Sequence, residues 1–117
     1  MNKKRVVITG MGALTPIGNS VDEYWKNLLS GKSGAEPITK FDASLFKTKF
    51  ACEVKNFDPL DIMDRKEARK MDPFSAYALA TTQEAILDSK LDLEKVNLDR
   101  AGVVWGSGIG GMYTFQE

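Results

Sequence analysis

Histidine is absent from the 117 residues, and Cys52 is the only cysteine. Since a Ser-His-Asp triad and a Cys-His pair both need an imidazole base, neither can be assembled from these residues alone. One cysteine excludes an internal disulfide, and a zinc site of the Cys/His type has too few ligands. We therefore interpret Cys52 as a small core residue.

Long apolar runs and an excess of either charge are also missing. Val6, Val7 and Ile8 follow a basic start but stop at Thr9, short of the ~7–15 apolar residues of a signal peptide. No stretch approaches the ~20 apolar residues of a membrane span. Sixteen basic residues balance sixteen acidic ones, so no global field attracts nucleic acid or an anionic membrane. We expect a cytoplasmic protein with neither partner, whose electrostatic recognition comes from a local patch.

Capping signals predict two amphipathic helices. The first begins at Ser20, whose capping box with Glu23 satisfies both amides, and ends at Gly31. The second spans residues 73–89, with Asp72 at its cap and proline in its first turn. The first has an apolar stripe at helical spacing, made of Val21, Tyr24, Trp25, Leu28 and Leu29. The second buries Phe74, Tyr77, Ala78, Thr81, Ala85 and Ile86 in this prediction.

Three short segments are predicted as strands. Residues 5–9 and 101–105 are apolar runs followed by glycine, and residues 50–54 alternate in polarity. Strands that alternate with helices indicate an α/β fold with some parallel pairing. We see no internal boundary in residues 1–117. The large aromatic side chains are interpreted as core packing: Trp25, Phe74, Tyr77 and Trp105.

A basic cluster follows Asp64, which is predicted to cap a brief helix. The cluster consists of two i,i+4 pairs of cations on one face: Arg65, Arg69, Lys66 and Lys70. Like-charge pairs at that spacing cost roughly 0.2–0.5 kcal/mol each, which suggests an anionic partner. The alternative is a solvated face neutralised by Asp64, Glu67 and Asp72.

Residues 106–111, here called the glycine loop, fit the pattern G-x-G-x-x-G after a predicted strand. That pattern can hold a dinucleotide pyrophosphate, so an independent α/β nucleotide-binding module is an alternative function. A close backbone approach at a strand end is the plainer interpretation. Residues 9–12 are similar to the nucleotide turn of short-chain dehydrogenases. The presence of Pro16 and the lack of a glycine at position 14, which is Leu14, favour a purely structural turn there.

Three stretches in order resemble the opening of the elongating β-ketoacyl-[acyl-carrier-protein] synthases, members of the thiolase-like superfamily. They are Arg-Val-Val-Ile-Thr-Gly-Met-Gly at 5–12 continuing to Pro-Ile-Gly-Asn at 16–19, Arg-Lys-Glu-Ala-Arg-Lys-Met-Asp at 65–72, and the glycine loop. The loop is more similar to the type II form than to type I at Ile109, and polyketide ketosynthases are more distant. The resemblance spans nearly all of the chain.

The resemblance implies the N-terminal part of a layered αβαβα fold and a homodimer. It also implies condensation of an acyl thioester with malonyl-[acyl-carrier-protein], with loss of CO2, by a Cys-His-His constellation in later parts of the family's chain. Cys52 does not occupy the nucleophile's motif, so no catalytic residue is assigned in this segment. No cofactor is implied, because the acyl carrier protein carries the phosphopantetheine.

The same resemblance assigns two sites. Lys66, Arg69 and Lys70, together with Arg65, match positions that dock the acyl carrier protein, and Ile109 matches a side chain that borders the acyl pocket. The chain stops at Glu117 without an evident helix cap or stop signal, which we interpret as a truncation. We expect the segment alone to be inactive and to fold poorly, because its strands would expose unpaired edges.

Overall fold

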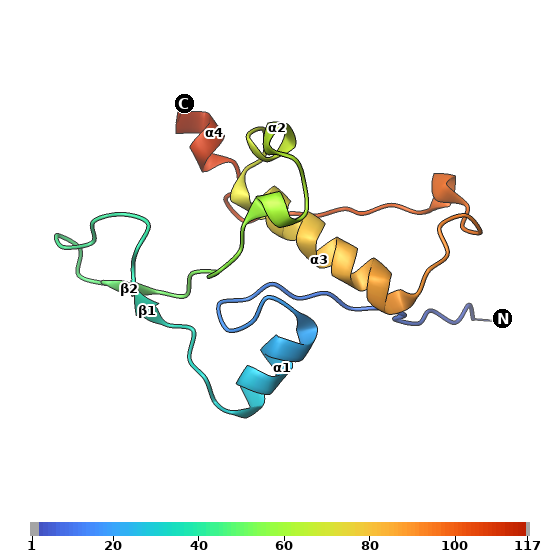
Figure 1. Cartoon of the computed structure of the whole chain (residues 1–117), viewed down its shortest axis with the longest axis horizontal. Helices are drawn as coiled ribbons and strands as arrows, with labels where there is room; N and C mark the ends of the chain where they lie inside the picture. The colour runs from blue at the N-terminus through green and yellow to red at the C-terminus, as the bar shows by residue number, and fades with distance from the viewer. Residues whose placement is uncertain (1–2, 117) are drawn as a thin grey trace.

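The computed structural model describes residues 3–116, and one long helix lies at the centre of them (Figure 1). The elements in chain order are α1 (Val21–Leu29), β1 (Glu36–Pro37), β2 (Phe50–Ala51), the 3-10 turn η1 (Pro59–Asp61), α2 (Arg65–Ala68), α3 (Pro73–Ser89), the 3-10 turn η2 (Leu98–Arg100) and α4 (Met112–Gln116). β1 and β2 pair antiparallel, with Glu36 opposite Ala51. α3 is the longest element, and the chain passes along it before α1 and again after η2 (Figure 1).

α1 forms where its capping signals predict, with one change in the cap. The Ser20 hydroxyl accepts the backbone N–H of Glu23 at 3.2 Å. The Glu23 carboxylate accepts the amide of Asn19 at 2.8 Å and not that of Ser20, so the expected reciprocal contact is made one residue earlier. Gly31 ends the helix at a φ of 71°, and its N–H returns to a carbonyl of the last turn, as a left-handed C-terminal cap requires.

α3 has the predicted bounds, Pro73–Ser89, and it carries the buried residues Ala76, Ala78 and Thr81. Ala76 was not on the predicted face. The other members of that face are half-buried: Phe74, Tyr77, Ala85 and Ile86. The helix ends at Lys90, which adopts the left-handed conformation with a φ of 53°.

Two glycines let the N-terminal segment lie directly on α3. A Cβ atom on Gly12 would overlap the carbonyl oxygen of Thr81, and one on Gly10 would overlap that of Ala85. The backbone of the segment therefore packs against the backbone of the helix, which only a residue without a side chain permits. This contact supplies a structural reason for both glycines in the turn at residues 9–12.

Acidic side chains of α3 hold the same segment by its amides. The Glu84 carboxylate accepts the backbone N–H groups of Ala13 and Val21, each at 2.8 Å. The Asp88 carboxylate accepts that of Met11 at 2.9 Å. Because Val21 is the first residue of α1, Glu84 joins α3, the N-terminal segment and α1.

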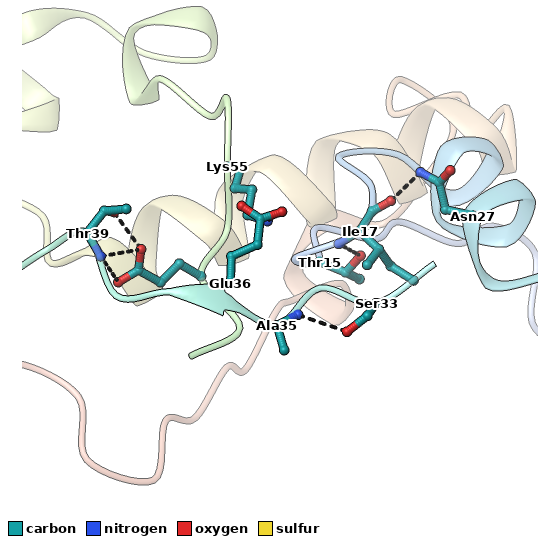
Figure 2. Close-up of polar contacts among 9 residues, drawn as sticks. Thr15, Ile17, Asn27, Ser33, Ala35, Glu36, Thr39 and Lys55 are labelled. Carbon is teal, nitrogen blue, oxygen red and sulfur yellow. Dashed lines mark hydrogen bonds and ion pairs between the residues drawn. The ribbon is translucent and has the colours of Figure 1, made fainter. Parts of the chain in front are cut away.

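Polar contacts organise the chain from Thr15 to Lys55 (Figure 2). Lys55 forms an ion pair with Glu36 of β1. The Thr39 hydroxyl donates to the Glu53 carboxylate at 2.6 Å and lowers the pKa of that carboxyl. The side-chain amide of Asn19 donates to the Lys55 carbonyl at 2.7 Å, so the start of α1 is tied to the residues after β2.

The strand predictions for residues 5–9 and 101–105 are wrong for this structure. Both segments are extended, but within residues 3–116 neither is paired with another strand. The predicted strand at 50–54 is reduced to Phe50 and Ala51. The reason is that an apolar sequence sets an extended backbone locally, whereas a strand also needs hydrogen bonds to a neighbouring segment.

Several side chains assigned to a core are exposed. Trp25 is 57% exposed and Trp105 is 52% exposed, and Cys52 also lies at the surface. An open groove of about 580 Å³ lies between the N-terminal segment, α3 and the segment from Leu98 to Trp105. The apolar faces of the two extended segments are thus left without a covering layer, which explains why the predicted core does not close.

The accessible surface and the radius of gyration also show that the structure is less compact than a typical globular domain of this size. The accessible surface is 10172 Å² for a chain of 12.9 kDa, whereas a compact monomer of that mass exposes about 6300 Å². The radius of gyration is 17.5 Å, against about 13 Å for a compact domain of this length. Among the described helices, none combines the length and the apolar character that crossing a bilayer requires.

Candidate functional site

The basic cluster lies on α2 and the turn that follows it. The four side chains are all exposed, and Asp64 caps the helix by accepting the backbone N–H of Glu67 at 2.9 Å, as predicted. The amide of Arg69 donates to the carbonyl of Arg65, so this pair has the expected i,i+4 spacing. The amide of Lys70 bonds to Glu67 instead of Lys66, because the chain tightens after a single helical turn. Lys66 and Lys70 therefore lack the i,i+4 helical spacing that was predicted for them.

The three nearby acids do not neutralise the cluster as a group. Glu67 forms an ion pair with Lys70 at 3.1 Å. Asp64 is engaged by a backbone amide, and Asp72 accepts the hydroxyl of Thr114 at 3.0 Å. Within the described residues, the other three cations form no ion pair: Arg65, Lys66 and Arg69. The structure thus leaves three exposed positive charges on one turn, which is a surface suited to an anionic partner.

The glycine loop runs from an extended segment into α4, and its two ends differ. Gly106 and Gly108 have open space where a Cβ atom would stand. A Cβ atom on Gly110 would lie 2.8 Å from the ring of Phe74, and Gly111 has a φ of 78°. The last two glycines are therefore the ones that the local geometry requires.

Ile109 is 83% exposed at the rim of a cavity of about 220 Å³. The cavity is lined from both the start of α3 and the glycine loop, by Asp72, Phe74, Tyr77, Ser107, Ile109 and Met112. Lys40 also lines it, so the lining combines apolar side chains with two charged residues, Lys40 and Asp72. Lys70, the last residue of the basic cluster, precedes Asp72 of this lining by two residues in the chain.

Sequence reasoning missed two contacts that shape these surfaces. Asp72 was predicted to cap α3, but its side chain makes no capping hydrogen bond and contacts Thr114. Glu84 was not singled out, although it joins three segments. One sequence signal was available for Glu84, which lies beside the face of small, apolar residues on α3. A carboxylate at such a position becomes half-buried and then needs hydrogen-bond donors.

The described residues bring together no group of three His, Cys, Asp or Glu side chains able to hold a metal ion. The glycine loop does precede a helix, α4, but that helix has only five residues. Neither candidate surface contains a nucleophile beside a base. What the geometry offers is an exposed, positively charged surface and a small cavity of mixed polarity.

Comparison with known proteins gives a consistent result over the whole chain. Residues 3–117 match the family described as "Beta-ketoacyl synthase, N-terminal domain". Proteins named 3-oxoacyl-[acyl-carrier-protein] synthase 2 are 48% identical over 117 residues in Synechocystis sp. and 51% identical over 112 residues in Coxiella burnetii. The one from Staphylococcus aureus strain COL is 51% identical over 113 residues.

The coverage is unequal between the partners of each comparison. The match includes 100% of this chain for the Synechocystis protein and 96% for the Coxiella protein, but only 28% and 27% of those relatives. Among solved structures, the ishigamide ketosynthase/chain length factor aligns with a TM-score of 0.70 at 37% identity. That alignment covers 77% of this chain and 22% of the other.

Proposed function

Because the chain belongs to the β-ketoacyl synthase family, we propose that it is the N-terminal portion of a 3-oxoacyl-[acyl-carrier-protein] synthase II of fatty-acid elongation. The family and the α/β, thiolase-like fold class predicted from the sequence are confirmed. The chain spans 28% of the length of the Synechocystis relative. The activity that we propose is therefore that of a full-length protein as long as these relatives. Residues 1–117 would form one segment of it, without an internal domain boundary.

The observation that carries the docking role is the set of unpaired cations on α2. Arg65, Lys66 and Arg69 are exposed and, among residues 3–116, form no ion pair, while Glu67 pairs with Lys70. An acidic acyl carrier protein would find these charges in a fixed arrangement, because Asp64 caps the helix that presents them. Charges at a solvent-exposed surface act mainly on the rate and orientation of association. We assign Lys66, Arg69, Lys70 and Arg65 to this docking surface.

The second assigned role is that of Ile109 at the acyl pocket. Its side chain is exposed on a loop with four glycines and borders a cavity. An apolar side chain on such a loop can move to admit an acyl chain at small cost in backbone strain. This placement supports a function in chain acceptance.

The whole protein would join an acyl thioester to malonyl-[acyl-carrier-protein], release CO2 and leave a 3-oxoacyl thioester and a free thiol. Residues 1–117 contribute no histidine to that chemistry. The acyl chains would arrive on the phosphopantetheine of the carrier protein, so the segment needs no cofactor of its own. We further propose a homodimer located in the cytoplasm.

The test is a reconstituted condensation. The full-length protein is mixed with acyl and malonyl forms of the acyl carrier protein, and the 3-oxoacyl product and CO2 are measured. We expect both products in equal amounts. Binding of NAD(P) without condensation would refute the proposal and favour the nucleotide-binding alternative.

A further inference from the structure

Asp72 stands at the position of a helix cap but directs its carboxylate elsewhere. Within the described part of the chain, its side chain accepts no backbone amide of α3. The hydroxyl of Thr114, 42 residues later, donates to it at 3.0 Å. Thr114 belongs to α4, the helix that directly follows the glycine loop. A side chain at the start of α3 therefore holds the far end of that loop.

The loop is also seated on α3 by a second contact. The backbone of Gly110 lies against the ring of Phe74, so closely that a side chain at this glycine would collide with the ring. The Asp72 carboxylate lies next to Gly111, 3.5 Å from where a Cβ atom would stand. The residues that immediately follow Ile109 are thus held between Asp72 and Phe74.

We propose that the contact between Asp72 and Thr114 is a latch that sets the position of Ile109. Both are positioning residues for acyl-chain selection, an inference that rests on the proposed function. Four of the six loop residues are glycine, so the loop has wide backbone freedom unless its ends are fixed. The latch fixes one end by a contact that makes no use of the reacting atoms.

Loss of the latch should change selectivity more than overall activity. With the loop end released, Ile109 samples more positions, and the pocket discriminates less between acyl chains of different length. Thr114 is exposed and Asp72 is half-buried, so water can replace the lost partner and the effect is small. We expect the ratio of kcat/KM values between the preferred and the disfavoured chain length to move about threefold towards one.

The experiment compares full-length variants with long and short acyl chains on the acyl carrier protein. Asp72→Ala and Thr114→Val each remove the latch, whereas Asp72→Asn keeps an acceptor and Thr114→Ser keeps the hydroxyl. We expect the first two to lower discrimination and the last two to behave as wild type. The double variant should lose no more than either single one, because the two residues act through one bond.

Asp99→Ala is the matched control, since the Asp99 carboxylate makes no hydrogen bond among the described residues. If Asp72→Ala fails to fold, the comparison of Thr114→Val with Thr114→Ser tests the latch by itself. Unchanged discrimination in Thr114→Val, or losses that add in the double variant, would overturn the latch. Failure of the proposed function gives a different result, because the wild-type protein would then not condense at all.

Discussion

Reversal of two charges on the basic cluster, as Lys66→Glu with Arg69→Glu, should weaken use of the acyl carrier protein selectively. Both side chains are exposed and form no ion pair within residues 3–116. Their replacement therefore breaks no described salt bridge. Asp64 continues to cap α2 through its bond to the amide of Glu67. The variant should fold as the wild type does, which makes its kinetics interpretable.

The magnitude follows from the exposure of the two sites. An exposed ion pair contributes roughly 0.2–1 kcal/mol, and reversal replaces attraction by a repulsion of similar size. Two reversals therefore change the association free energy by about 1–4 kcal/mol. Neutralisation by Lys66→Ala with Arg69→Ala should cost about half of that. The KM for the carrier protein should accordingly rise in two steps, from wild type through the neutral variant to the reversed one.

A variant of opposite sign sharpens the test. Glu67 pairs with Lys70 at 3.1 Å, so Glu67→Gln removes a negative charge and frees a cation. The kcat/KM with the carrier protein should then rise by at most about fivefold, which corresponds to the energy of one exposed ion pair. Improvement would be hard to explain if the cluster had only a structural role.

The assay measures kcat/KM with an acyl carrier protein and, in parallel, with a small acyl thioester. The loss should appear with the carrier protein alone and should shrink as salt is raised, because the Debye length falls from about 8 Å at 0.15 M to about 3 Å at 1 M. Lys47→Glu with Lys49→Glu, in the loop between β1 and β2, is the control with the same change in charge. Equal losses with both substrates, or equal losses in the control, would refute the docking role.

Four further predictions concern the pocket, the packing and the folding of the segment. Ile109→Phe should impair long acyl acceptors before short ones, and kinetics that ignore chain length would contradict its place at the pocket. Gly12→Ala should lower the free energy of unfolding of the full-length protein by about 1–3 kcal/mol, since a Cβ atom there overlaps the Thr81 carbonyl. An unchanged Tm would show that α3 can move to accommodate the added methyl group. Thr39→Val should raise the pKa of Glu53 towards its ordinary value in an NMR titration, because the threonine hydroxyl is the main cause of the lowering; the stabilisation that this contact provides is present above the ordinary pKa and is lost as the pH falls through the lowered one. The isolated segment should show no cooperative thermal transition by circular dichroism, given its exposed apolar faces, and a sharp reversible melt of the monomer would contradict this.

Helix positions followed from residues that are neighbours along the chain. Ser20, Gly31 and Asp64 ended or began helices as predicted, because a cap is made with atoms three or four residues away. The same holds for the bounds of α3. The identity of the family could also be predicted, since it depends on ordered motifs and not on their packing.

Burial and pairing were predicted less well, and the reason is the same for each error. Trp25, Trp105 and Cys52 are apolar, but their burial needs a covering layer that the described residues do not provide. The segments 5–9 and 101–105 have strand-like sequences, yet a strand exists only when a second strand supplies its hydrogen bonds. Apolar pattern indicates which side chains are suited to burial and leaves open what buries them.

Local patterns were thus enough to establish α1, α2 and α3, the exposed basic cluster and the family to which the chain belongs, whereas α4 was not predicted. Only the path of the chain in space decided that Glu84 would reach Ala13 and Val21, and that Asp72 would leave its own helix for Thr114. These contacts join residues 42 to 71 positions apart. A carboxylate accepts whichever donor lies within about 3 Å, and the sequence near it does not say which distant donor that will be.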